Sequence, residues 1–140
     1  MATYKRFEDL PIWQDARVFA IQVFEASKKG EFSKDYRLCS QIRASSGSIM
    51  DNIAEGFERD GNGEFKQYLY IAKGSCGESR SQIYRAYDYG YIEKDVFEKL
   101  KFLSEEISKS ISSFIEYLQT TEIKGLKYKK PDNPKDNPKS

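Results

Sequence analysis

The carboxylates Glu55 and Glu78 are the strongest candidates for acid–base chemistry, because the pattern predicts both to be buried. Two acids with different pKa values can exchange protons with a substrate only when they lie close together. Counting along the two helices that meet at Gly61 places these carboxylates ~16 Å apart along the axis. The chain contains no histidine, which removes His-dependent triads, bases and metal sites. The sequence therefore predicts no enzyme, no catalytic residue, no bound metal and no cofactor.

The two cysteines, Cys39 and Cys76, are predicted to be structural. Their distances from the turn at Gly61 differ by ~10 Å along the helices, which is too far for a disulfide. No histidine is present to activate either thiol. Two reduced cysteines agree with a reducing compartment such as the cytoplasm.

A line of basic residues could contact nucleic acid, because its members recur every seven residues and tyrosines share their face. The line and its tyrosines are Arg59, Lys66, Lys73 and Arg80, with Tyr70, Tyr84 and Tyr87. Basic groups contact phosphates and tyrosines can stack on exposed bases. The alternative is an ordinary solvated stripe, and the acidic neighbours Glu58, Glu64 and Asp88 weigh against strong binding.

Charge and hydropathy narrow the class of protein. The 140 residues carry a net charge of +1. The last 19 residues contribute +3 of this charge, so residues 1–121 are nearly neutral and do not indicate a general polyanion binder. No apolar run approaches the ~18 residues of a membrane span, and the charged N-terminus lacks a signal-peptide core. We therefore expect a soluble, cytoplasmic protein without a membrane partner.

Apolar residues at steps of three and four predict four helices, at about 11–28, 34–59, 63–89 and 94–121, with Ser33 capping the second. Short breaks between long helices favour antiparallel neighbours, so the predicted fold is an all-α, up-down-up-down four-helix bundle over residues 1–121. Residues 122–140, rich in Lys, Pro and Asn, are predicted to form a disordered tail. The residues expected to face the core from the first helix are Trp13, Ala16, Ala20, Val23 and Phe24.

A polar stripe with little charge runs beside the apolar stripe of the second helix. Its members are Gln41, Ser45, Ser48, Asn52, Glu55 and Arg59. Solvated helix faces are usually rich in Lys and Glu, because small hydroxyls and Asn are poorer helix formers. We therefore expect this helix to be contacted on more than one side, with the polar stripe against another copy of the chain.

The turn at Gly61 also predicts which residues lie level across the second and third helices. Residues 44–48 should lie beside 74–77, and close backbone approach would compensate for Gly74 and Gly77, which cost roughly 1 kcal/mol each relative to Ala. A small ligand cavity is the alternative. Arg43 and Glu78 are also level, and we expect them to form an ion pair, since a buried charge needs a partner.

Several motifs, in order and at matching spacing, resemble one bacterial family. They are FEDLPIWQ at 7–14, QIR at 41–43, SI at 48–49, NIAEG at 52–56, EF at 64–65 and GSCGE at 74–78. Over about residues 5–120 the chain is similar to the family first noticed as products of intervening sequences in bacterial 23S ribosomal RNA genes. The chain departs from it at Met50-Asp51, where members often have Pro-Ser.

The resemblance implies an antiparallel four-helix bundle that assembles into a ring-like homopentamer. A relative serves diversity-generating retroelements as an accessory protein that binds the reverse transcriptase and nucleic acid. The matching motif positions imply a polar network within or between protomers, formed by Gln41, Arg43, Asn52, Glu55 and Glu78.

The leading functional prediction is a non-enzymatic, homo-oligomeric four-helix bundle, a pentamer, that acts as a scaffold or adaptor for a partner protein. The alternative is an RNA- or DNA-binding accessory protein, associated with rRNA intervening sequences or a reverse transcriptase, that uses the basic line and its tyrosines.

Overall fold

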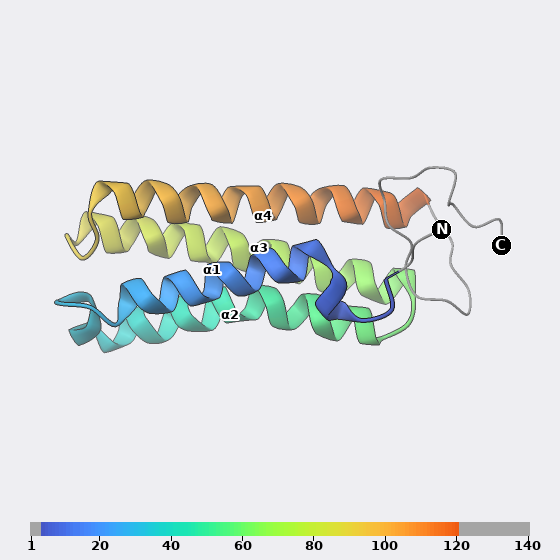
Figure 1. The fold of residues 1–140 in the computed structure, drawn as a ribbon, viewed down its shortest axis with the longest axis horizontal. Helices are drawn as coiled ribbons and strands as arrows, with labels where there is room; N and C mark the ends of the chain where they lie inside the picture. The colour runs from blue at the N-terminus through green and yellow to red at the C-terminus, as the bar shows by residue number, and fades with distance from the viewer. Residues whose placement is uncertain (1–3, 121–140) are drawn as a thin grey trace.

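A computed structural model describes residues 4–120 of the protein, which form four long antiparallel helices (Figure 1). The helices are α1 (Pro11–Ser27), α2 (Tyr36–Glu58), α3 (Asn62–Asp88) and α4 (Lys94–Thr120), with short 3-10 helices η1 (Phe7–Asp9) and η2 (Phe32–Lys34) before α1 and α2. The predicted all-α, up-down-up-down bundle is confirmed. The predicted disordered tail, residues 122–140, lies outside the described residues.

The four helices stand at the corners of a square. Each helix packs against its two neighbours in the order α1, α2, α3, α4 and back to α1. The α1–α4 face and the α2–α3 face are consequently opposite sides of the bundle. None of the helices in the described part of the chain is long and apolar enough to cross a membrane.

The helix ends follow ordinary capping chemistry, with one correction. Pro11 begins α1, where its missing N–H costs nothing. Asp35, and not Ser33, caps α2, since its Oδ1 accepts the Leu38 N–H at 3.0 Å. Ser33 instead donates its hydroxyl to the Gly30 carbonyl at 2.6 Å, because η2 intervenes before α2 begins.

The core side of α1 differs in part from the prediction. Ala16 and Val23 are buried as expected, but Phe19 takes the position between them and is completely buried. Phe24 is 45% exposed, so its predicted core position is wrong. Inward positions on α1 step 16, 19 and 23, and residue 24 lies one residue, about 100° of helix rotation, beyond this line. Trp13 and Ala20 are half-buried.

The helices α2 and α3 approach each other closely at Gly56. A Cβ atom built on Gly56 would lie 2.5 Å from Cβ of Tyr68. Cβ atoms built on Gly47, Gly74 and Gly77 would meet nothing within 4 Å. The predicted close approach at Gly74 and Gly77 is therefore wrong within the protomer.

We expect Gly56→Ala to lower the free energy of unfolding by about 1–3 kcal/mol, because Tyr68 Cβ is fixed to the α3 backbone and cannot move aside cheaply. Urea denaturation followed by circular dichroism measures the change. Gly63→Ala is the matched control, since a Cβ there meets nothing within 4 Å, and we expect it to leave the free energy of unfolding unchanged or to raise it by up to about 1 kcal/mol through helix propensity. Equal effects of the two substitutions would contradict the close approach at Gly56.

Candidate functional site

A polar seam joins α2 to α3 and contains most of the predicted stripe. At its centre, the buried Ser45 hydroxyl lies 2.6 Å from Gln82 Oε1 and 2.9 Å from Ser79 Oγ. A hydroxyl has one proton, so Ser45 donates to Gln82 and accepts from Ser79. Gln82 Nε2 in turn donates to Glu78 at 3.4 Å.

The seam continues toward the α2–α3 turn. Ser75 donates to Ser48 Oγ at 3.0 Å, and Asn52 Nδ2 donates to the same oxygen at 2.8 Å. Because Ser48 and Ser75 meet, the pairing predicted by counting from Gly61 is correct to within a residue or two.

Charged groups close both ends of the polar seam. Near the turn, Glu55 accepts hydrogen bonds from Arg59 at 3.2 Å and from the Tyr68 hydroxyl at 3.1 Å. At the other end, Arg85 donates to Gln41 Oε1 at 3.2 Å. The polar stripe of α2 is thus contacted by α3 of the same chain, and its small polar residues are explained without another copy.

Neither of the two acids predicted to be buried is buried. Glu55 has a side chain that is 55% exposed, and Glu78 is also exposed. The prediction of buried carboxylates is wrong, because both lie at the outer edge of the polar seam, where long side chains reach water.

Arg43 does not pair with Glu78. Its Nε donates to the Ser27 hydroxyl at 2.8 Å, and its guanidinium carbon lies 4.7 Å from the centre of the Phe24 ring. Both contacts are on α1. The predicted ion pair is wrong because Arg43 projects from the α1 side of α2, whereas Glu78 is on α3.

The two cysteines are free and buried, as predicted. Cys39 Sγ lies 3.1 Å from the carbonyl oxygen of Phe32. Burial raises the pKa of the Cys76 thiol to about 12, so this group stays protonated and is a poor nucleophile near neutral pH. Among the residues that the structure describes, no group of three or more metal-ligating side chains comes together.

The end of the bundle opposite the α2–α3 turn is held by Asp35 and Tyr91. The Tyr91 hydroxyl donates to Asp35 Oδ2 at 2.9 Å, and the Tyr91 ring stacks on Phe32. The hydrogen bonds from the Leu38 N–H and from Tyr91 lower the pKa of Asp35. The hydrogen bond from the Tyr91 hydroxyl to Asp35 also raises the pKa of Tyr91.

The predicted basic line is divided between two places. Arg59 contacts Glu55, Glu64 and the Tyr68 ring beside the α2–α3 turn. Lys73 lies in a groove between α3 and α4 with the 53% exposed Tyr70.

The other predicted members differ in what they contact. Tyr84 packs edge-on against Phe97 of α4, and Tyr87 stacks on the same ring with centroids 4.4 Å apart. Lys66 and Arg80 are half-buried. Arg59 is therefore separate from the basic residues of α3, and Tyr87 serves the α3–α4 packing.

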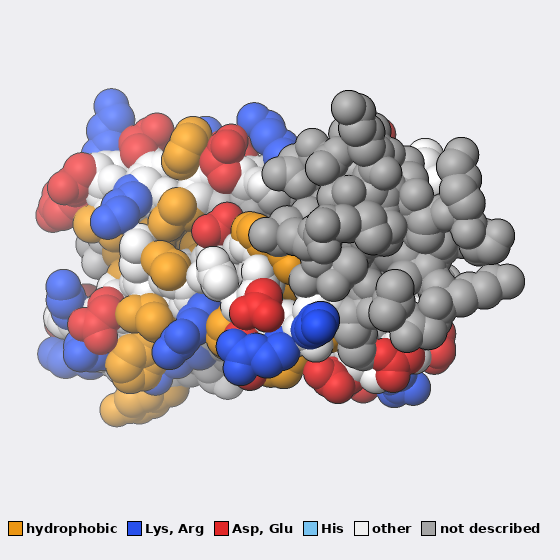
Figure 2. Space-filling model, turned by 45° about the vertical axis from the view of Figure 1, so that its right-hand side comes forward, with side chains coloured by type: hydrophobic (Ala, Val, Ile, Leu, Met, Phe, Trp, Pro, Cys, Tyr) orange, Lys and Arg blue, Asp and Glu red, His pale blue; other side chains and the backbone are white. Residues whose placement is uncertain are grey.

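The α1–α4 face carries exposed apolar side chains that the sequence did not single out. Val18, Ile21 and Phe102 are 48%, 52% and 59% exposed. Val18 lines one groove with Trp13 and Ile21 and a second groove with Phe102 and Leu103, and charged side chains border both, Glu8 and Arg17 in the first and Asp15 and Glu106 in the second. We call Val18, Ile21 and Phe102 the apolar band. Figure 2 shows hydrophobic side chains among the charged ones on the side of the bundle where α4 lies above α1.

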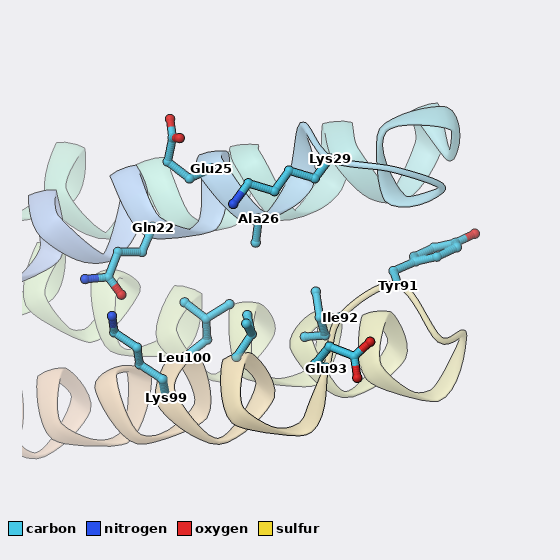
Figure 3. Close-up of a pocket in the computed structure, with 10 residues that line it drawn as sticks. Gln22, Glu25, Ala26, Lys29, Tyr91, Ile92, Glu93, Lys99 and Leu100 are labelled. Carbon is cyan, nitrogen blue, oxygen red and sulfur yellow. The ribbon is translucent and has the colours of Figure 1, made fainter.

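A pocket opens at one end of the same α1–α4 face (Figure 3). It has a volume of about 370 Å³, and α1, the α3–α4 connection and the start of α4 line it. Gln22 Oε1 is buried there without a hydrogen-bond partner. The sequence signal for this pocket is a polar Gln22 one position before the buried Val23.

The described residues define a small all-α protein, an antiparallel four-helix bundle with one polar seam and one open apolar face. A family model described as "23S rRNA-intervening sequence protein" matches residues 8–113. The chain belongs to this family, which confirms the resemblance seen in the motifs.

The fold is also similar to a solved structure. It is the crystal structure of a protein with unknown function from the S23 ribosomal protein family of Bacteroides thetaiotaomicron. The identity is 23% and the TM-score 0.69, over 75% of this chain and 98% of that chain. At this identity the likeness shows the fold alone. No curated protein matches the chain.

We expect Gln82→Leu to lower the free energy of unfolding by about 1–3 kcal/mol, because Ser45 loses its acceptor inside the polar seam. Denaturant unfolding of the full chain measures the change. Gln41→Leu is the matched control at the exposed end of the polar seam, with an expected change below about 0.5 kcal/mol. An equal loss of unfolding free energy in both variants would show that the buried hydrogen bond of Gln82 contributes no more stability than the exposed one of Gln41.

Proposed function

We propose that the protein is a non-enzymatic, homo-oligomeric scaffold that presents a surface to a partner protein in the cytoplasm. The observation that carries this proposal is the apolar band of Val18, Ile21 and Phe102 on the α1–α4 face, with each side chain about half exposed. Large contiguous apolar patches are rare on soluble monomeric proteins, and where they occur they often mark interaction sites.

The opposite face supplies a surface that this band could contact. On the outer surface of α2 and α3, Gly47 and Gly74 leave open space where a Cβ would stand. Each glycine costs about 1 kcal/mol inside a helix relative to Ala, and nothing in the protomer packs into the space. A ring requires two different contacting faces on each subunit, and opposite sides of a bundle meet that requirement.

The family resemblance supports a ring of five subunits, since it implies a homopentamer. The absence of histidine and the buried, protonated Cys76 support a protein without catalytic chemistry. The same reduced, buried cysteines support the cytoplasm as its compartment.

We expect Phe102→Glu to lower the particle mass measured by light scattering to that of one chain. A carboxylate in the apolar band would cost about 2 kcal/mol or more per interface, or ~30-fold in association. Circular dichroism should stay unchanged, since Phe102 is 59% exposed in the protomer.

Tyr36→Glu provides the control for the Phe102 variant. Tyr36 is 80% exposed and lies at the start of α2, away from the apolar band. We expect this variant to keep the particle mass of the unmodified protein. If light scattering gives the unmodified protein the mass of a single chain, the scaffold proposal is wrong.

A second candidate function, binding of RNA or DNA, is favoured by three cations on α3. The ion pairs found within residues 4–120 do not involve Lys66, Lys73 or Arg80. The exposed Tyr70 lies beside Lys73. These cations and this ring match the combination that single-stranded nucleic acid requires.

If α3 binds nucleic acid, we expect Lys66→Gln together with Lys73→Gln to weaken binding of single-stranded RNA at ~50 mM salt. The slope of log affinity against log salt should fall by about 1.4, since each lost phosphate contact contributes about 0.7. Lys101→Gln with Lys109→Gln on α4 is the control of equal charge, with the slope unchanged. No detectable binding of the unmodified protein at that salt concentration removes this function.

A further inference from the structure

A groove between α3 and α4 brings an exposed aromatic ring together with groups of both charges. The two helices run side by side and antiparallel (Figure 1), and the groove between them has a volume of about 330 Å³. Its lining residues are Tyr70 and Lys73 of α3 and Ser112, Ile115, Glu116 and Gln119 of α4. Ile115 is 4% exposed and forms an apolar floor between the polar side chains.

The Tyr70 ring forms one wall of this groove. Its hydroxyl accepts a hydrogen bond from Gln119 Nε2 of α4 at 3.5 Å, so the ring extends from α3 across to the other helix. Tyr70 nevertheless remains 53% exposed. An exposed tyrosine ring can stack on a nucleobase, because every base has a flat π face.

Lys73 and Glu116 lie at the same level of the groove. Lys73 follows Tyr70 by three residues, and Glu116 precedes Gln119 by three. Because the helices are antiparallel, both residues lie on the same side of the Tyr70–Gln119 contact, ~4.5 Å along the axis. Both line the groove.

These two opposite charges do not neutralise each other. Neither Lys73 nor Glu116 belongs to the ion pairs found within residues 4–120. A ligand that lies between them satisfies both charges when it donates hydrogen bonds toward the carboxylate and accepts one from the ammonium group.

Guanine is the base whose edge fits this arrangement. Its N1–H and N2–H groups are neighbouring donors, and a carboxylate accepts two parallel N–H bonds. Its O6 and N7 atoms are acceptors that a lysine can contact. Adenine and cytosine each place an acceptor nitrogen where guanine has N1–H, and uracil places carbonyl oxygens on both sides of its single N–H. Those acceptors would face the carboxylate and repel it.

We propose that the α3–α4 groove binds a guanine base of a single-stranded nucleic acid. The base stacks on Tyr70, its N1–H and N2–H groups donate to Glu116, and its O6 accepts from Lys73. Lys66 and Arg80 lie seven residues to either side of Lys73, ~10.5 Å along α3, where they can contact the flanking phosphates. The proposal rests on the nucleic-acid function proposed above and names the base that this surface selects.

The test uses the full chain and fluorescently labelled pentanucleotides, with binding measured by anisotropy at ~50 mM salt. The reference is UUUUU, and its central base is replaced by guanine, adenine or hypoxanthine, which is guanine without the N2 amino group. We expect the guanine version to bind about tenfold tighter than the reference, because it adds hydrogen bonds to a charged group. The adenine version measures purine stacking alone and should bind several-fold more weakly than the guanine version. The hypoxanthine version should lie between guanine and uracil.

Variants are compared by the ratio of guanine to uracil affinity, because the loss of an acid by itself strengthens the binding of every oligonucleotide alike. Glu116→Gln should lower this ratio to about that of adenine to uracil. Glu106→Gln is the matched control on the same helix, since Glu106 borders the α1–α4 groove, and it should leave the ratio unchanged.

Substitutions of Tyr70 test the stacking contact. Tyr70→Ala should weaken binding of the guanine pentanucleotide about tenfold, whereas Tyr70→Phe, which keeps the ring and loses only the contact with Gln119, should bind as the unmodified protein does. Circular dichroism should stay unchanged in both variants, since Tyr70 is exposed.

Three results would overturn the guanine site and leave the nucleic-acid function in place. They are equal binding of the guanine and uracil pentanucleotides, equal binding of guanine and hypoxanthine, and an unchanged ratio in Glu116→Gln. A uridine 15-mer separates the two proposals when no pentanucleotide binds at ~1 mM protein. Binding of the 15-mer would then remove the guanine site alone, and its failure to bind would remove both.

Discussion

The buried hydrogen bonds between Ser45, Ser79 and Gln82 hold α2 and α3 in the alignment that the short turn at Gly61 sets, and α1 and α4 pack against this helix pair. Apolar surfaces on two helices can slide by a turn at little cost, but buried hydroxyl and amide groups cannot lose their partners so easily. Moving α3 along α2 by one turn, ~5.4 Å, would separate these three side chains. The polar seam therefore stabilises the alignment set by the turn, together with the close approach of Tyr68 to Gly56.

The same pairing explains why the two opposite faces differ. On the α2–α3 side, small polar residues and Gly56 let the helices approach closely and satisfy each other. On the α1–α4 side, Val18 and Phe102 remain about half exposed, and a pocket stays open between the helices. The surface available to other molecules is thus determined by which helix pair the sequence closes with hydrogen bonds.

Much of the fold could be predicted because it depends on distance along the chain. Helix periods, the turn at Gly61 and the level of Ser48 with Ser75 all follow from counting residues. The direction of each side chain around its helix was harder to predict. Arg43 is near the level of Glu78 but points toward α1, and Phe24 is one residue away from the buried line.

The candidate sites were harder to predict than the fold, because the role of a polar side chain depends on which surface packs against it. The polar stripe on α2 showed correctly that a second contact exists, but the one-dimensional pattern does not distinguish a helix of the same chain from another copy. Gln22 shows the opposite problem, since a single polar residue beside an apolar stripe looks ordinary until its partner proves to be missing.

The physical case for assembly consequently moves from α2 to the α1–α4 face. The polar stripe has its partner in α3, so it no longer requires another molecule. The apolar band and the open glycines lie on opposite sides and have no partner within the protomer. Two unlike surfaces on opposite sides lead either to a closed ring or to an open filament, depending on the angle between successive subunits. A protein built in this way must control that angle, and the rigid α2–α3 pairing provides a fixed reference for it.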